Sequence, residues 1–73
     1  MIDDGTYDAI VVDVDDADGG VRVELALASG PHKGEVVAVR GTFAVADPLE
    51  LLGLPATLVV ADGAPSVTVE GLG

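Results

Sequence analysis

Alternation of apolar and polar side chains is the feature that most constrains the fold of this chain. It is clearest in residues 21–27, where Val21, Val23, Leu25 and Leu27 share one parity. Because successive side chains of a β-strand point to opposite faces, this period of two predicts a strand that is buried on one face. The same alternation, or an excess of β-branched residues, predicts four further strands. These strands cover residues 6–14, 35–43, 56–61 and 66–70.

The period changes once, in residues 47–50 (DPLE). An acidic N-cap, a proline at the first helical position and a glutamate at the third favour the start of a helix. Gly53 can end this helix in the left-handed conformation, so we expect one short helix near residues 48–52. Its leucines, or the next one along the chain, would plug one end of the fold: Leu49, Leu52 or Leu54.

The expected order of elements is three strands, a short helix and two strands. This is the element order of the OB-fold, a five-stranded, partly open Greek-key barrel. The sequence therefore predicts an all-β protein with one short helix, a small five-stranded antiparallel OB-like barrel (β-β-β-α-β-β) that forms a single domain over residues 1–73. An SH3-like barrel would usually place its helical turn before the last strand, and an open antiparallel meander is a further alternative.

Small size and acidic charge limit what the protein can do. A chain of 73 residues without cysteine has a small core and no disulfide, so assembly with itself or with a partner would supplement its stability. Thirteen acidic residues face only Arg22, Lys33 and Arg40, which gives a net charge of −10. This charge repels nucleic-acid phosphates and anionic membranes. Neither a signal peptide nor a membrane span is recognisable, and we expect a cytoplasmic protein.

The stretch DVDDADGG at residues 13–20 raises the question of a calcium site. If Gly19 takes the sixth position of an EF-hand loop, Val14 and Leu25 fall at the first and twelfth positions, where oxygen ligands are required. The flanks have strand periodicity, whereas an EF-hand needs helices. Asp-Gly and Gly-Gly instead favour a hairpin turn. We expect a turn and no metal site, with weak calcium binding at residues 13–18 as the alternative.

No group of residues has the pattern of a catalytic or cofactor site. His32 is the only histidine and is expected in a solvated hairpin turn, with no cysteine or second histidine to complete a zinc site. The glycines in residues 30–34 (GPHKG) lack the spacing of a phosphate loop and precede a strand. The sequence therefore predicts no enzyme, no cofactor and no catalytic residue.

The segments GTYDAIVVDV and VRVELALASGPHKGEVV resemble the opening of small OB-fold proteins, in particular phage-type single-stranded-DNA-binding proteins. The resemblance covers about the first half of the chain and rests on Gly5, Tyr7, Gly30, Gly34 and Val36. It implies binding of single strands on the face of the second and third strands. The residues available for such a face are Tyr7, Arg22, Lys33 and Arg40. The segment DPLELLGLPATLVV resembles parts of short uncharacterised bacterial proteins, which implies no function.

A nucleic-acid face needs cations and stacking aromatics, and this chain offers few of either. A second candidate surface consists of apolar residues whose parity is opposite to that of the expected core: Val11, Val36, Ala38 and Val59. For Val11 this assumes that Ile10, Val12 and Val14 point inward. A second copy or a protein partner would cover such a face. We therefore predict a non-catalytic protein-interaction or assembly module, with single-stranded nucleic-acid binding as the alternative and no membrane contact.

Overall fold

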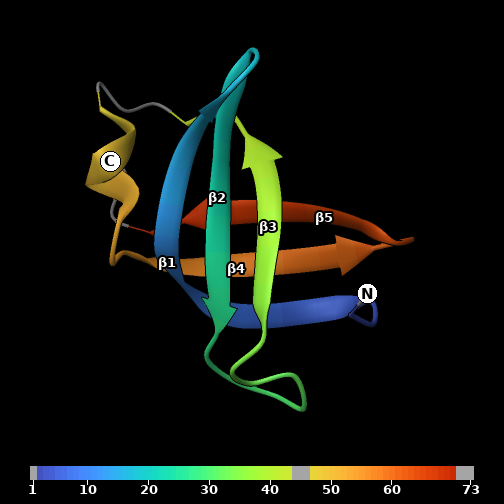
Figure 1. Cartoon of the computed structure of the whole chain (residues 1–73). Helices are drawn as coiled ribbons and strands as arrows, with labels where there is room; N and C mark the ends of the chain where they lie inside the picture. Colours follow the sequence, from blue (N-terminus) through green and yellow to red (C-terminus); the bar gives the residue numbers. More distant parts are fainter. Residues whose placement is uncertain (1, 44–46, 71–73) are drawn as a thin grey trace.

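Five antiparallel strands and one turn of 3₁₀ helix make up the computed structural model, which describes residues 2–43 and 47–70 (Figure 1). The strands are β1 (Gly5–Ala17), β2 (Gly20–Leu27), β3 (Val36–Gly41), β4 (Pro55–Ala61) and β5 (Ala64–Val69), and the helical turn is η1 (Pro48–Leu51). The prediction of an all-β chain with five antiparallel strands is confirmed. Among the described residues, no helix has both the length and the apolar character needed to cross a membrane.

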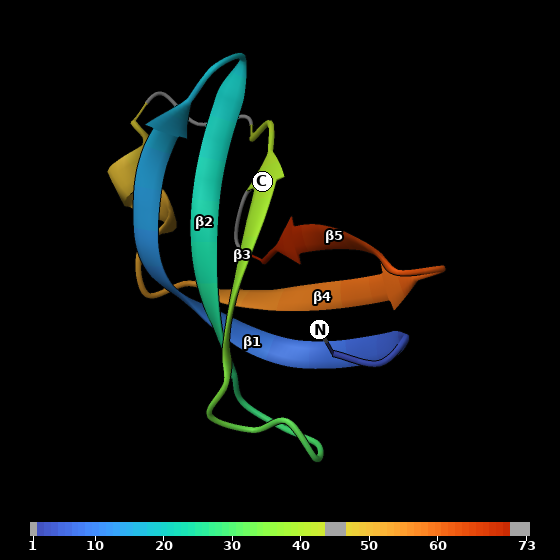
Figure 2. The same cartoon turned by 45° about the vertical axis from the view of Figure 1, so that its right-hand side comes forward.

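The strands form one sheet in the order β3-β2-β1-β4-β5, which curls into a half-barrel (Figure 2). β1 serves both halves of the sheet: residues 5–10 pair with β4, and residues 9–17 pair with β2. Because β1 bends along its length, β1, β2 and β3 cross in front of β4 and β5 in Figure 1. β3 and β5 are the two edges of the sheet, and they face each other across the open side of the half-barrel.

A bulge at Val12 decides which side chains of β1 are buried. The pairing with β2 shifts between Val11 and Asp13, so that Val12 has no partner in the ladder. Val11 is 1% exposed and Val14 is 9% exposed, whereas Val12 is 49% exposed. A bulge adds one residue to one strand, which reverses the inward and outward parity beyond it.

This bulge overturns two predictions for β1. Val11 is a core residue and does not belong to an outer face. The sequence predicts that Ile10 and Val12 point inward with Val14, but both are exposed on the outer face. The prediction extends one uninterrupted alternation back from Val14, and the bulge breaks that alternation.

The helical turn η1 closes one end of the core. Leu51 is fully buried, and Leu54 packs partly buried against the core. The predicted plug residues Leu49 and Leu52 are exposed, so that part of the prediction is wrong. The backbone hydrogen bonds of η1 span three residues, as in a 3₁₀ helix, which has three residues per turn. Leu49 and Leu52 therefore share the outer side, and Leu51 lies on the same side as Pro48.

A tight turn joins β1 to β2 where the sequence predicts one. It lies at Asp18-Gly19, and Gly19 has a φ of 75°, which a residue without a Cβ adopts at no steric cost. However, β1 continues through Asp15 and Asp16, so these two acids belong to the strand and not to the turn. Consecutive strand residues point to opposite faces, and the acidic run is therefore divided between the two faces of the sheet.

Candidate functional site

An apolar row crosses the outer face of the sheet. Strand pairing places Val36 of β3 opposite Ala26 of β2, Ala26 opposite Ile10 of β1, and Ile10 opposite Pro55 of β4. Residues directly opposite one another have their side chains on the same face of a sheet. Val36 is 57% exposed and Ile10 is 44% exposed. We call these four residues, one from each of four neighbouring strands, the apolar row.

Two further apolar residues lie beside the apolar row. Val12 follows Ile10 at the bulge, and Ala38 lies two residues beyond Val36 on β3; both are exposed. Val59, which the sequence suggests for the same face, is 37% exposed. It pairs with Thr6, near the start of β1, whereas the apolar row crosses β1 at Ile10. The structure thus joins Val36 and Ala38 on one surface and separates them from Val59.

Carboxylates flank the apolar row on both sides. Asp8 precedes Ile10 by two residues on β1, and its Oδ2 accepts a hydrogen bond of 3.4 Å from Ser29 Oγ. On the other side, Asp13 lies opposite Glu24 on the neighbouring strand. The apolar row is therefore an uncharged strip between acidic groups.

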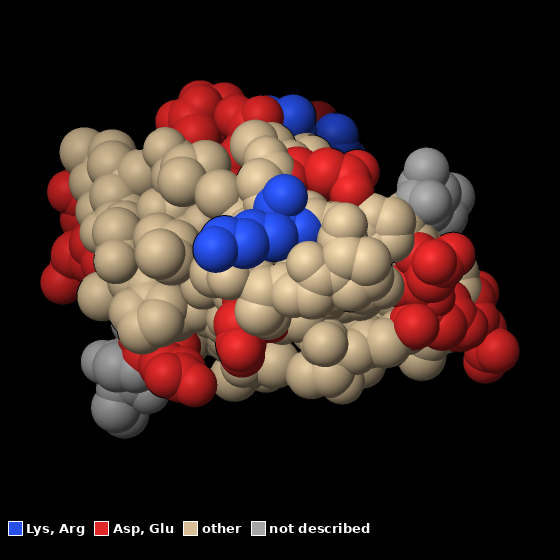
Figure 3. All heavy atoms as spheres, turned by 90° about the horizontal axis from the view of Figure 1, so that it is seen from below, with Lys and Arg blue, Asp and Glu red and all other residues tan. Residues whose placement is uncertain are grey.

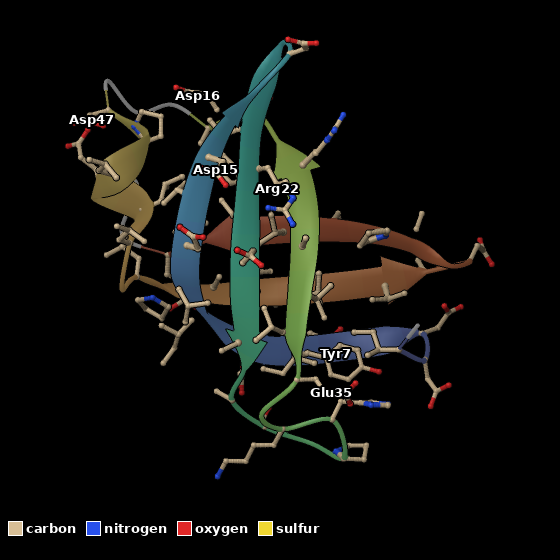
Figure 4. The ribbon with its side chains drawn as sticks, viewed as in Figure 1. Tyr7, Asp15, Asp16, Arg22, Glu35 and Asp47 are labelled. Atoms are coloured by element: carbon tan, nitrogen blue, oxygen red, sulfur yellow. The ribbon has the colours of Figure 1, made fainter. Side chains whose placement is uncertain are left out.

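The two arginines are neighbours on the same outer face. Arg22 of β2 lies directly opposite Arg40 of β3. Arg22 is held by carboxylates, with Nη1 3.8 Å from Asp15 Oδ2 and Nη2 3.9 Å from Glu24 Oε1. Figure 4 shows Asp15 and Arg22 close together at the front of β1 and β2. Two neighbouring carboxylates thus offset part of the positive charge of Arg22.

The other two residues of the predicted nucleic-acid face lie away from the arginines. Tyr7 is 7% exposed in the core, and its hydroxyl donates a hydrogen bond to the backbone oxygen of Asp3. A buried ring has no open face on which a base could stack. Lys33 is exposed in the loop between β2 and β3, at the opposite end of β2 from Arg22. The structure brings Arg22 and Arg40 together and leaves Tyr7 and Lys33 apart from them.

A groove of about 310 Å³ lies where the edge of β3 faces the β4–β5 hairpin. Its lining consists of residues 35–38 on one side, Val60, Gly63 and Pro65 on the other, and Ile2. Val36 belongs both to this groove and to the apolar row. Sequence reasoning does not find the groove, because its walls come from strand edges that are far apart in the chain.

His32 lies in a loop as predicted, but it is not a free solvated side chain. Its Nδ1 is hydrogen-bonded to the Glu35 carboxylate, its Nε2 lies 3.6 Å from Asp3 Oδ2, and its ring meets Tyr7 edge-on with centroids 6.0 Å apart. The hydrogen bond to Glu35 outweighs partial burial and, with Asp3, raises the pKa of His32 above its ordinary value of 6.5. Figure 4 shows Tyr7 and Glu35 near each other at this end of the sheet. Nδ1 therefore bonds within the loop, whereas Nε2 and the ring contact with Tyr7 link the loop to the N-terminal part of the chain.

Within residues 2–43 and 47–70, no three or more histidine, cysteine, aspartate or glutamate side chains gather in a group that could hold a metal ion. In the acidic stretch, the Asp13 carboxylate accepts a hydrogen bond of 2.9 Å from the N–H of Val14, and Asp15 faces Arg22. The carboxylates of Asp13 and Asp15 thus have partners within the chain.

Comparisons with models of protein families, with curated proteins and with solved structures find no match to this chain.

Proposed function

We propose that this chain is a non-catalytic protein-interaction module and that the apolar row is its contact face. The proposal depends on the continuity of the row, because its four apolar residues adjoin on the outer face across four neighbouring strands. Val36 and Ile10 expose 57% and 44% of their surface. Single exposed valines are ordinary on protein surfaces. A contiguous apolar strip is a surface that proteins commonly cover by association.

The charges around the apolar row indicate the chemistry of its partner. Asp8 lies on one side of the row, and Asp13 and Glu24 lie on the other. A protein surface with an apolar strip and basic flanks would complement both features. A second copy matches only the apolar strip, and each copy carries a net charge of −10, so self-association needs salt to screen the repulsion.

The absence of catalysis is proposed from the environment of the one histidine. Both ring nitrogens of His32 adjoin carboxylates, Glu35 at Nδ1 and Asp3 at Nε2. The two carboxylates raise the pKa of His32 and so favour the protonated imidazole, which cannot accept a proton from a substrate. Ser29, whose hydroxyl donates to Asp8, has an ordinary loop hydrogen bond.

We also propose that the half-barrel is OB-like. Three features support this assignment: β1 is shared between β2 and β4, β3 and β5 face each other across the open side, and η1 lies between β3 and β4 in the chain. These features match a five-stranded, partly open barrel.

Binding of single-stranded nucleic acid is the alternative function, and one observation favours it. Arg22 and Arg40 adjoin on β2 and β3, the strands on which OB-folds bind single strands. Against it, Arg22 is engaged with Asp15 and Glu24, and Tyr7 is buried. In the described part of the chain Tyr7 is buried and Phe43 packs against the core, and the two arginines are the only cations on this face, so we rank nucleic acid below a protein partner.

Sedimentation equilibrium at low and at high salt tests the apolar row, with a second copy as the probe. Charge repulsion should keep the protein monomeric at low salt, whereas apolar burial persists when salt screens the charges. We therefore expect self-association only at high salt. Ile10→Asp should abolish it by placing a carboxylate within the row. Ser66→Asp, which adds the same charge at an exposed position of β5, should leave it unchanged.

Two outcomes would contradict this proposal. One is self-association at high salt that Ile10→Asp leaves unchanged, which would place the contact outside the apolar row. The other comes from fluorescence anisotropy with a labelled single-stranded oligonucleotide: micromolar binding at low salt that disappears in Arg40→Glu would favour the nucleic-acid alternative.

A further inference from the structure

We propose that the edge of β3 and the adjoining groove bind an extended segment of a partner protein in which apolar and basic residues alternate. The segment would add a strand to the sheet next to β3, a known mode of peptide recognition. This inference rests on the proposed function and specifies how the partner is held.

The backbone of β3 presents hydrogen-bonding groups toward the groove that have no backbone partner among residues 2–43 and 47–70. The N–H of Leu27 donates to the carbonyl of Glu35 at 2.9 Å, which fixes the hydrogen-bonded positions of the β2–β3 ladder. In steps of two, these positions continue along β3 at Val37 and Val39. The N–H and C=O groups of Val36 and Ala38 therefore point away from β2. Such a row of groups at a sheet edge is a template for another strand.

The other edge of the sheet is less suited to pairing. The N–H of Glu70 donates to the carbonyl of Pro55 at 2.9 Å, so even-numbered positions of β5 bond toward β4. Odd-numbered positions of β5 then face the free edge. One of them is Pro65, which has no N–H to donate. β3 contains no proline, so every one of its edge-facing residues has an N–H to donate, and it is the edge better suited to pairing.

The groove provides a place for the side chains of the added strand. Successive side chains of that strand would point alternately into the groove and to the outer face. Its apolar side chains would enter the groove, where Ile2, Val60 and Pro65 supply apolar contacts, and its basic side chains would lie on the outer face, from which they can reach carboxylates at the rim of the groove. A volume of about 310 Å³ suits aliphatic side chains.

Carboxylates at both walls of the groove favour basic residues in the bound segment. Glu35 lines the wall on β3. On the opposite wall, the Asp4 carboxylate accepts a hydrogen bond of 3.1 Å from the N–H of Gly63, which lines the groove. Figure 3 shows acidic side chains around the rim of the face at this end of the molecule. A second copy would bring another Glu35 and a further charge of −10 to the same edge, so a basic segment is the favoured occupant.

Fluorescence anisotropy with a labelled octapeptide of alternating valine and lysine tests this proposal. Peptides of the same length with alternating glycine and lysine, or valine and glutamate, are the controls. We expect the valine–lysine peptide to bind at least about tenfold more tightly than either control, because only it offers both the apolar and the basic side chains. In the wild-type protein, the amide hydrogens of Val36 and Ala38 should exchange more slowly when this peptide is bound.

Two variants of one residue test strand addition directly. Ala38→Pro removes a donor that faces the edge, at a kind of position where edge strands tolerate proline, and should weaken binding at least about tenfold. Ala38→Val keeps the donor and should bind as the wild type does. Thermal melting of both variants checks that they are folded.

The remaining outcomes separate this proposal from the proposed function. Three outcomes would overturn the edge proposal. The glycine–lysine peptide could bind as tightly as the valine–lysine peptide, Ala38→Pro could bind the valine–lysine peptide as tightly as the wild type does, or the valine–lysine peptide could fail to bind. Binding that is lost in Ile10→Asp but kept in Ala38→Pro would also overturn it and would leave the apolar row as the contact face. Binding that is lost in Ala38→Pro but kept in Ile10→Asp would support strand addition at the edge of β3. The salt-dependent self-association would then decide whether the apolar row is a contact face.

Discussion

The carboxylate of Asp4 accepts hydrogen bonds from the backbone N–H groups of Asp62 and Gly63, at 3.0 and 3.1 Å. Asp62 and Gly63 are the central residues of the turn between β4 and β5, with φ values of 53° and 76°. Positive φ at both central positions is the requirement of a type I′ turn, which favours Asp-Gly. A residue that precedes β1 thus braces a hairpin near the other end of the chain and holds one wall of the groove.

Asp4→Ala should lower the free energy of unfolding by about 1 kcal/mol, because two backbone N–H groups lose their charged acceptor. Asp4→Asn removes the same charge as Asp4→Ala but keeps one oxygen acceptor, so it should lower the free energy of unfolding by less. Urea denaturation of the three proteins measures the difference. Identical unfolding midpoints would show that this brace does not stabilise the hairpin.

Asp47→Ala should destabilise the protein by about 0.5–2 kcal/mol through loss of an N-cap. The predicted capping box is present: Asp47 Oδ1 accepts from the N–H of Leu49 at 3.0 Å, and Glu50 Oε2 accepts from the N–H of Asp47 at 3.2 Å. Asp47→Asn keeps a side-chain acceptor and is the matched control. A melting curve that Asp47→Ala leaves unchanged would argue against a role for the cap.

Leu51→Ala should cost about 2–5 kcal/mol, because it leaves a cavity at a fully buried position. Leu52→Ala removes the same atoms from the neighbouring residue, which is 43% exposed, and should cost less than about 1 kcal/mol. Chemical denaturation distinguishes the two variants. Equal losses would contradict the assignment of Leu51 as the residue that closes the core.

Stability should fall as the pH rises above 6.5, the ordinary pKa of histidine. Glu35 and Asp3 raise the pKa of His32 in the folded protein above its value in the unfolded chain. The stabilisation by protonated His32 is therefore fully present at a pH below the pKa of the unfolded chain, and it is lost as the pH rises through the pKa of the folded protein. Burial, together with nearby carboxylates, raises the pKa of Tyr7 above 10.0, so Tyr7 does not titrate in this window. The melting temperature should therefore fall less steeply with rising pH in His32→Asn than in the wild type, as thermal melts at several pH values would show. Parallel slopes for the two proteins would contradict the prediction.

Calcium should bind residues 13–18 weakly, if at all. Asp15 and Asp16 point to opposite faces of the sheet, and Asp15 faces Arg22, so they do not converge on one ion. Isothermal titration calorimetry at micromolar protein should detect no saturable binding. Sub-micromolar affinity that disappears in Asp16→Asn would contradict this expectation.

The sequence by itself determined the features that depend on a few neighbouring residues. The alternation of β2 follows from the geometry of one extended strand, and the capping box of Asp47 and Glu50 follows from the geometry of one helical turn. The turn at Gly19 needs only a residue that tolerates positive φ. None of these features depends on which strands are neighbours, and each could therefore be predicted.

Tertiary structure alone decided which side of β1 is buried and which residues form the candidate site. Ile10, Val11 and Val12 are consecutive β-branched residues, and nothing local distinguishes the one that enters the core. The pairing of β1 with β2 introduces the bulge at Val12, which exposes Ile10 and buries Val11. Register between strands then aligns Ile10 with Ala26 and Val36. The physical reason is that the period of a strand is a local property, whereas its register is set jointly by distant segments that bury a common core.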